Sequence, residues 1–263
     1  MYYSYRRNAQ FGRLGLTWKQ TLKEVVRAGL SRLGVYDPIR KALGKSLDHL
    51  DRPSLQERFS RIYEKGHWTR GDKNHPLSGS GSSLKATQDL RSELPGLLRS
   101  LETGTLLDIG CGDFTWMQQV DLTGIRYIGA DIVPSVVETN RARFGADDIT
   151  FLHADAVSDP LPEADVVLIR ETLFHLCFED VRALLNNVLS SPRRWILMTS
   201  DSLSDFNADI RSGDFRLLNL QAAPFRLPAP SHRIDESSVR PGRHLGAWPA
   251  ESVAAALKAK ATA

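Results

Sequence analysis

The stretch Leu106-Leu107-Asp108-Ile109-Gly110-Cys111-Gly112 decides the fold of this chain. An apolar run that ends in Asp-x-Gly-x-Gly is typical of a buried strand that turns tightly beneath a nucleotide-like ligand. Glycine at positions 110 and 112 lets the backbone bend and approach a ligand without an intervening Cβ, and the expected following helix would present free N–H groups. The stretch therefore predicts a bound cofactor.

Two positions in and after this turn distinguish between classes of cofactor. A dinucleotide fingerprint would have a third glycine where this chain has Thr115, and it seldom has an acid at the place of Asp108. These differences favour S-adenosylmethionine over a nicotinamide dinucleotide. A nicotinamide-dependent oxidoreductase of the same fold is the alternative.

Composition sets the class of protein. The chain has 263 residues, of which 41% are hydrophobic and 25% charged, as is ordinary for a globular protein with one full core. No apolar run approaches the roughly 20 residues that a bilayer span needs, so no integral membrane association is expected. The two cysteines, Cys111 and Cys177, support neither a disulfide framework nor a cysteine-based zinc site, and we therefore expect a location in the reducing cytoplasm.

Strand and helix patterns alternate along the middle of the chain. Short, mostly apolar segments separated by helical patterns predict a doubly wound α/β fold with a mostly parallel sheet. The predicted strands cover residues 105–109, 126–130, 149–152, 165–170 and 195–199. Ligands of such sheets bind at the carboxyl edge. Four polar residues lie at that edge by this assignment: Asp108, Asp131, Asp155 and Arg170.

Outside these strands the patterns are weaker. Residues 71–83 predict a loop, and a helix is expected over residues 84–100, with Pro95 and Gly96 indicating a kink or break near its end. Beyond residue 200 two further strands are predicted, at 215–220 and 243–247. We therefore divide the chain into a helical N-terminal segment or lid, residues 1–83, and a Rossmann-like domain, residues 84–263.

Residues 1–50 are strongly basic, with ten Lys and Arg against three Asp and Glu. Apolar residues recur there at helical spacing, which predicts a basic amphipathic helix; they are Leu22, Val25, Val26, Leu30 and Leu33. Such a helix packs on the core with a solvated basic face, or makes peripheral contact with anionic lipid or an acidic substrate. An arginine-rich organellar presequence is a third interpretation.

Asp131 follows Asp108 by 23 residues and ends the second predicted strand. A carboxylate there can accept hydrogen bonds from both ribose hydroxyls of a nucleoside, while the alternative is a cap for the next helix. Asp155 follows the third strand. Its side chain could accept a hydrogen bond from the exocyclic amine of adenine, while the alternative is a simple turn residue.

Three segments resemble the successive cofactor motifs of class I S-adenosylmethionine-dependent methyltransferases: residues 106–112, 127–132 (Tyr-Ile-Gly-Ala-Asp-Ile) and 151–156 (Phe-Leu-His-Ala-Asp-Ala). The resemblance covers roughly residues 84–200 and implies a Rossmann-like, doubly wound, mostly parallel seven-stranded sheet. Four segments further resemble a poorly characterised bacterial subgroup of this family: residues 78–83, 111–117, 170–176 and 215–225.

The resemblance also implies a set of cofactor-binding residues. These are Asp108, Gly110 and Gly112 at the methionine, Asp131 with the adjacent Ile132 at the ribose, and Asp155 with Ala156 at the adenine. Arg170 is expected to position the methionine or the substrate.

Methyl transfer needs little covalent help from a protein, because the sulfonium is already a reactive donor. A base is needed mainly for hydroxyl or protonated amine acceptors. His175, five residues beyond the fourth predicted strand, is the candidate base, and Glu171 is the second candidate catalytic residue. For His175 the alternative is a packed structural histidine.

Aromatic residues before the loop predict a lid over the cofactor, since aromatic faces suit a positively charged sulfonium. They lie with Ile62 in residues 59–68: Phe59, Tyr63 and Trp68. Ordinary core packing is the alternative, as it is for Trp116 and Met117. His67 and His75 raise the question of a metal, but no acid or cysteine completes a recognisable set in the sequence, so no metal is assigned.

The sequence thus predicts a methyltransferase that acts on a small-molecule or glycan-linked acceptor, with oxygen favoured as the methylated atom. Methylation of DNA bases is disfavoured, because Arg170-Glu171-Thr172-Leu173 stands where those enzymes carry Asn/Asp-Pro-Pro-aromatic, and no nucleic-acid partner is expected. The alternative is a non-catalytic S-adenosylmethionine-binding scaffold. We expect a monomer or a homodimer.

Overall fold

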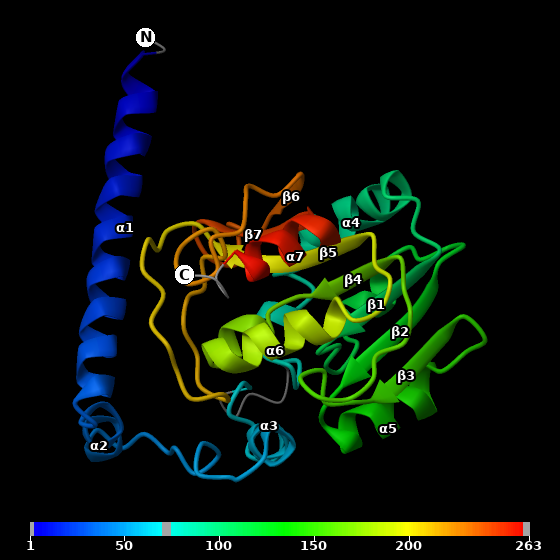
Figure 1. Cartoon of the computed structure of the whole chain (residues 1–263), viewed down its shortest axis with the longest axis horizontal. Coiled ribbons are helices and arrows are strands. Elements are labelled where there is room, and N and C mark those ends of the chain that lie inside the picture. Colours follow the sequence, from blue (N-terminus) through cyan, green and yellow to red (C-terminus); the bar gives the residue numbers. More distant parts are fainter. Residues whose placement is uncertain (1–2, 70–74, 260–263) are drawn as a thin grey trace.

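The computed structural model describes the backbone of residues 3–69 and 75–259 and the side chains of residues 18–69 and 75–259. Seven strands form one sheet in the order β3-β2-β1-β4-β5-β7-β6 (Figure 1). They are β1 (Thr105–Ile109), β2 (Arg126–Asp131), β3 (Ile149–His153), β4 (Val166–Ile169), β5 (Trp195–Asp201), β6 (His232–Asp235) and β7 (Arg243–Pro249). The first five are parallel, and β7 is antiparallel to β5 and β6. The predicted Rossmann-like, mostly parallel seven-stranded sheet is confirmed.

Both faces of the sheet are covered, because neighbouring residues of a strand point to opposite sides. The helices of the domain are α4 (Gln88–Ser100), α5 (Pro134–Phe144), α6 (Phe178–Val188) and α7 (Ala250–Lys258). Leu106 belongs to a hydrophobic cluster that includes residues of α4, whereas Leu107 belongs to one that includes residues of α6 and α7. Three 3₁₀ turns complete it: η1 (Ser80–Ser82), η2 (Met117–Gln119) and η3 (Leu173–His175).

The prediction of a strand at residues 215–220 is wrong. That segment is buried but joins no ladder, because β7 pairs with β5 over seven residues and occupies the edge where the segment would have to pair. It is held by separate bonds instead, such as Asp201 N–H to the Leu218 carbonyl at 2.9 Å. The seventh strand is β6, which the sequence did not indicate.

The break predicted near Pro95 is also absent. α4 runs through Pro95 and Gly96 to Ser100, with Pro95 buried in its interior. The helix begins at Gln88 rather than 84, since Ser83 Oγ accepts the Ala86 N–H at 3.2 Å in a separate preceding turn. Contacts of α4 with the sheet thus outweigh the local preference of proline for a helix end.

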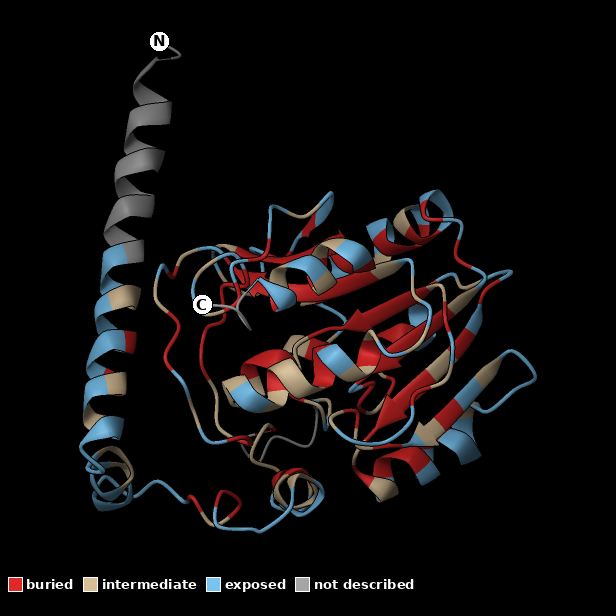
Figure 2. Ribbon diagram, in the orientation of Figure 1, coloured by how far each residue is buried: buried red, intermediate tan, exposed pale blue. Residues whose placement is uncertain are grey.

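The N-terminal segment consists of α1 (Tyr3–Arg32), α2 (Tyr36–Ala42) and α3 (Leu55–Glu64). α1 lies beside the loop of residues 204–216 and contacts it through polar groups: Arg27 donates to Asp214 Oδ2 at 2.6 Å (Figure 1). Its predicted apolar face is turned outward, with Leu22, Val25, Val26 and Leu33 exposed while Glu24 and Arg27 are buried (Figure 2). The prediction that this face packs on the core is therefore wrong for the side chains that the structure describes. No helix within residues 3–69 and 75–259 has the length and apolarity to span a membrane.

α3 begins with a complete capping box. Ser54 Oγ accepts the Glu57 N–H at 3.2 Å, and Glu57 Oε2 accepts the Ser54 N–H at 3.4 Å. Because these bonds satisfy two end groups that the helix itself leaves unpaired, the entry of the chain into α3 is fixed.

Ser54→Ala should lower the free energy of unfolding by about 1 kcal/mol, because the N-cap acceptor is lost. Urea unfolding followed by circular dichroism measures the change. Ser92→Ala, an exposed position inside α4, is the matched control and should change stability by less. Equal stabilities of the two variants would contradict the role of the cap.

The carboxyl group of Asp108 is buried within β1. It accepts a hydrogen bond from the Tyr127 hydroxyl at 2.7 Å. Burial raises its pKa to about 7, against the partial opposing effects of Tyr127 and Arg170. The folded chain therefore holds a proton on Asp108 at pH values where an unfolded aspartate, with a pKa near 3.9, has lost it.

The stabilisation that the folded chain gains from the raised pKa of Asp108 is present in full below about pH 4 and is lost as the pH rises through 7. Asp108→Asn should remove this pH dependence. Between pH 4 and 7 the free energy of unfolding should then fall by about 2 to 4 kcal/mol less in the variant than in the parent. Urea unfolding at pH 4, 5, 6, 7 and 8 measures both proteins, with exposed Asp147→Asn as control. Parallel pH profiles would rule the effect out.

Candidate active site

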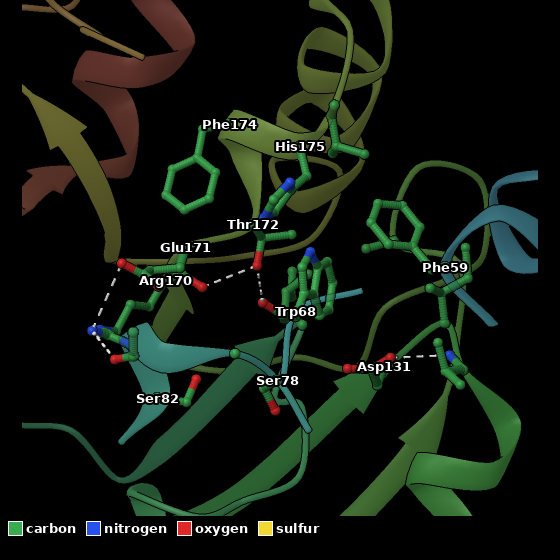
Figure 3. A pocket seen from close by; sticks show the side chains of 18 of the residues that line it. Phe59, Trp68, Ser78, Ser82, Asp131, Arg170, Glu171, Thr172, Phe174 and His175 are labelled. Carbon is green, nitrogen blue, oxygen red and sulfur yellow. Dashed lines mark hydrogen bonds and ion pairs between the residues drawn. The ribbon is translucent and has the colours of Figure 1, made fainter. Parts of the chain in front are cut away.

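A cavity of about 410 Å³ opens at the carboxyl edge of the sheet. Its walls come from the ends of β1, β2 and β4, from α3 and the turn after it, from residues 78–82, and from Val239, Arg240 and Arg243. Figure 3 shows Arg170, Glu171 and Thr172 together on one wall, with Asp131 across the pocket. The polar strand ends that the sequence singled out are thus mostly gathered around one space.

The glycine turn after β1 lies at the base of the cavity, which Gly110 lines. Gly110 and Gly112 have φ angles of 74° and 59°, which favour glycine. A Cβ on Gly110 would lie 2.4 Å from Thr172 Oγ1, and one on Gly112 would lie 2.3 Å from Ser78 Oγ. Glycine is required here by backbone conformation and by the closeness of two other segments.

Asp131 lies at the end of β2 and lines the cavity. One carboxylate oxygen accepts the Gly112 N–H and the other accepts the Val133 N–H, both at 3.0 Å. Burial raises its pKa, although these backbone bonds act in the opposite direction. Since each carboxylate oxygen has two lone pairs, the group retains the capacity to accept two further hydrogen bonds.

The wall beyond Asp131 contains Ile132, Asp155 and Ala156. Asp155 Oδ1 accepts the Val157 N–H at 3.0 Å, and its own N–H donates to Asp159. The side chain thus stabilises its own turn while it borders the cavity.

Asp108 and Gly112 are placed differently, because neither lines the cavity. Asp108 lies behind the glycine turn with its carboxyl group on Tyr127, and the Gly112 carbonyl accepts a hydrogen bond from Asn140 at 2.7 Å. Both residues support the turn from the side of the sheet. Trp116 and Met117 are likewise buried away from the cavity.

The end of β4 carries a buried network of charges. Arg170 donates to Glu236 at 2.6 Å, and Arg243 donates to Glu171 at 2.5 Å and to Asp201 at 3.0 Å. Burial acts to raise the pKa of Glu171, but the two arginines outweigh it and lower that pKa. Glu171 therefore lines the cavity as an ion-paired carboxylate.

His175 lines the cavity from the 3₁₀ turn after β4. Its Nδ1 lies 2.8 Å from the Asp214 carbonyl oxygen. Burial lowers its pKa to about 4. Because a carbonyl oxygen only accepts, Nδ1 carries the proton of the neutral ring and Nε2 carries the lone pair.

Aromatic rings from the N-terminal segment meet this histidine. The Trp68 ring centroid lies 5.1 Å from that of His175 and 5.2 Å from that of Tyr63. Phe59, Tyr63 and Trp68 line the cavity, whereas Ile62 is buried in the core and does not. The four residues named from the sequence thus divide between the cavity and the core.

Several cavity residues were missed in the sequence. Ser78, Gly79, Ser80, Gly81 and Ser82 come from the predicted loop; the repeated glycines were the available signal for close backbone approach. A Cβ on Gly81 would lie 1.9 Å from Glu171 Oε2. Arg240 and Arg243 gave no local signal.

Residues 107–190 match a protein-family model described as a methyltransferase domain. Among solved structures, N-methyltransferase NodS from Bradyrhizobium japonicum WM9 with S-adenosyl-L-homocysteine is 14% identical, with 75% of this chain and 98% of that chain covered and a TM-score of 0.50. Human N-acetylserotonin methyltransferase with S-adenosylmethionine is 15% identical, with 88% and 65% covered and a TM-score of 0.49. No curated protein sequence matches the chain.

The methyltransferase domain of bacterial Hen1 is 16% identical, with 44% of this chain and 66% of that chain covered and a TM-score of 0.40. The chain therefore spans just under two thirds of the length of that protein and of the human enzyme.

The cavity walls suit S-adenosylmethionine. The turn at Gly110 would be filled by any Cβ, the Asp131 carboxylate retains acceptor capacity, and the rings of Tyr63 and Trp68 border the same space. In chemical character the glycine turn suits the amino-acid part of that molecule, and the carboxylate suits its ribose hydroxyls. The aromatic faces suit its sulfonium. Residues 107–190 are thus similar to a methyltransferase domain, and the sheet has the fold of the NodS methyltransferase.

Proposed function

We propose that this methyltransferase acts on a hydroxyl group of a small-molecule or glycan-linked acceptor that enters the cavity of about 410 Å³. The observation that carries the proposal is the neutral His175 in the cavity wall, with its Nδ1 proton held by the Asp214 carbonyl oxygen. A hydroxyl acceptor must lose a proton on methylation, and the Nε2 lone pair supplies a place for it.

The cofactor is proposed to lie along the carboxyl edge of the sheet. The Gly110 turn, which Asp108 and Gly112 support from behind, would border its methionine. Asp131, beside Ile132, would bond its ribose hydroxyls, and Asp155 with Ala156 would border its adenine. Arg170 is proposed to hold the adjoining wall of the cavity in place through its hydrogen bond to Glu236. The support is the common position of the six cavity-lining residues of this group, together with the acceptor capacity left on Asp131.

When bound, S-adenosylmethionine would supply an electrophilic methyl group to the acceptor oxygen, and the electrons of the broken C–S bond would return to sulfur. The hydroxyl proton passes to Nε2 of His175. A base with a pKa of about 4 suffices, since a hydroxyl becomes strongly acidic as its oxygen gains a bond to carbon. Glu171, held by Arg243, is proposed to position the acceptor through its carboxylate oxygens.

Residues 1–83 are proposed to act as the helical lid, and residues 84–263 as the catalytic domain. Tyr63 and Trp68 would cover the sulfonium, since both line the cavity and their rings pack edge to face. The exposed apolar residues of α1, together with the basic character of residues 1–50, favour peripheral contact with an anionic surface. A cytoplasmic location, a monomer or homodimer, and the absence of a nucleic-acid partner stay predictions.

Asp131→Asn should weaken binding of S-adenosylmethionine and S-adenosylhomocysteine about 10- to 100-fold, because a charged acceptor of ribose hydroxyls becomes a neutral amide. Isothermal calorimetry measures the affinity, with NAD as a second ligand. Asp147→Asn, an exposed aspartate before β3, should bind as the parent does. Parent-like affinity in Asp131→Asn would remove the proposed ribose contact.

His175→Gln should lower kcat about 100- to 10,000-fold and leave cofactor affinity unchanged, because glutamine cannot take the proton. Formation of S-adenosylhomocysteine is followed with a panel of hydroxylated, sugar-linked and amine acceptors. NMR of products from ¹³C-methyl-labelled cofactor identifies the methylated atom. Because the pKa is about 4, the parent enzyme should show no inflection of rate near pH 6.5.

Exposed His232→Gln serves as the control for the loss of a histidine and should retain parent kcat. Methylation at nitrogen alone, or full kcat in His175→Gln, would overturn the hydroxyl mechanism. Calorimetric cofactor binding without turnover on any acceptor class would favour the non-catalytic scaffold.

A further inference from the structure

A cluster of three metal-ligating side chains lies beside α3. Asp48 and His49 belong to the turn before the helix, and His67 to the turn after it. Each offers one ligand atom, and these atoms lie within 4.8 Å of one another. Asp48 Oδ1 is 3.8 Å from His67 Nε2, and the two imidazole centroids are 4.8 Å apart.

Two nitrogen atoms of this cluster have unused hydrogen-bonding capacity. Within the described residues, His49 Nδ1 and His67 Nε2 are buried and have no hydrogen-bond partner. The His49 side chain is only 7% exposed. Because a buried polar atom without a partner is costly, such atoms call for a specific explanation.

Neighbouring groups hold the ligands in place. Asp48 accepts hydrogen bonds from Ser46 Oγ and Arg61 Nε, each at 2.7 Å. Gly213 packs against the His49 ring, since a Cβ built on this glycine would lie 3.6 Å from His49 Cδ2.

We propose that Asp48, His49 and His67 bind a divalent first-row transition-metal cation, of which Zn²⁺ is the best-suited example. Two imidazoles and one carboxylate form a ligand set suited to zinc, with a fourth position left for water. Mg²⁺ and Ca²⁺ are disfavoured, since both prefer oxygen ligands. Zinc bonds of about 2.0 to 2.1 Å require ligand atoms about 3.3 Å apart, so the cluster contracts on binding.

The bound cation would fasten the turns on either side of α3 to each other. His67 lines the cavity and precedes Trp68, whose ring faces His175. Metal binding would thereby fix the wall that carries Trp68. The competing explanation is an ion pair between protonated His67 and Asp48, which needs no metal.

The test uses the full chain without a polyhistidine tag, stripped of metal by a chelator and dialysed. Co²⁺ is titrated while its visible d–d absorption is recorded, and Zn²⁺ is then added as a competitor. We expect one Co²⁺ per chain with a four- or five-coordinate spectrum that Zn²⁺ abolishes. Absence of that spectrum would overturn the proposal and favour the ion pair.

His49→Gln and His67→Gln should each weaken Co²⁺ binding about 10- to 100-fold or more, while exposed His232→Gln binds as the parent does. Circular dichroism checks the fold of each variant, and Asp48→Asn replaces His49→Gln if the buried substitution prevents folding. Parent-like Co²⁺ affinity in folded His67→Gln and in the second folded variant would also overturn the proposal.

Thermal unfolding gives a second readout. Zn²⁺ at about 100 times its Kd should raise the Tm of the parent and of His232→Gln by about 5 to 10 °C, and should raise the Tm of His67→Gln by about half as much or less. Both measurements omit S-adenosylmethionine and any acceptor, so their outcome is independent of the proposed methyl transfer.

Discussion

Two buried arginines at the carboxyl edge of the sheet are the constraint on which the rest of the site depends. Arg170 bonds Glu236, while Arg243 bonds Glu171 and Asp201. Removing such ions from water costs several kcal/mol each, so every member needs its partners in place. The partners come from the ends of β4 and β5, the start of β7 and the turn before it. These elements must therefore meet before the cavity acquires this wall.

The N-terminal helices and the candidate base are connected through Asp214. Its carboxylate accepts hydrogen bonds from Arg27 of α1 and Arg40 of α2, at 2.6 and 2.8 Å. Its backbone carbonyl fixes the Nδ1 proton of His175. The position of α1 and α2 therefore bears on the tautomer of a residue far away in the sequence. A polar attachment of this kind also explains why α1 leaves its apolar side chains in solvent.

The local sequence pattern was sufficient to predict most of the sheet and the half of the cavity proposed to hold the cofactor. β1 to β5 and β7 lie where short apolar runs predicted them, because a strand buried on both faces needs such a run wherever it pairs. The turn at Gly110 and the position of Asp131 follow from the same rule, since the carboxyl ends of parallel strands meet at one edge. The proposed identity of the cofactor depends on the family resemblance, because residue spacing alone does not determine it.

The sequence by itself thus determined the doubly wound fold, the glycine turn and the acid at the end of β2. Only the tertiary structure decided that residues 215–220 form no strand, that α4 continues through Pro95, and that His67 approaches His49. Apolar periodicity records whether a segment is buried, and it does so within a few residues. Which buried segment obtains a strand partner, or which turn meets another, depends on surfaces brought together from distant parts of the chain.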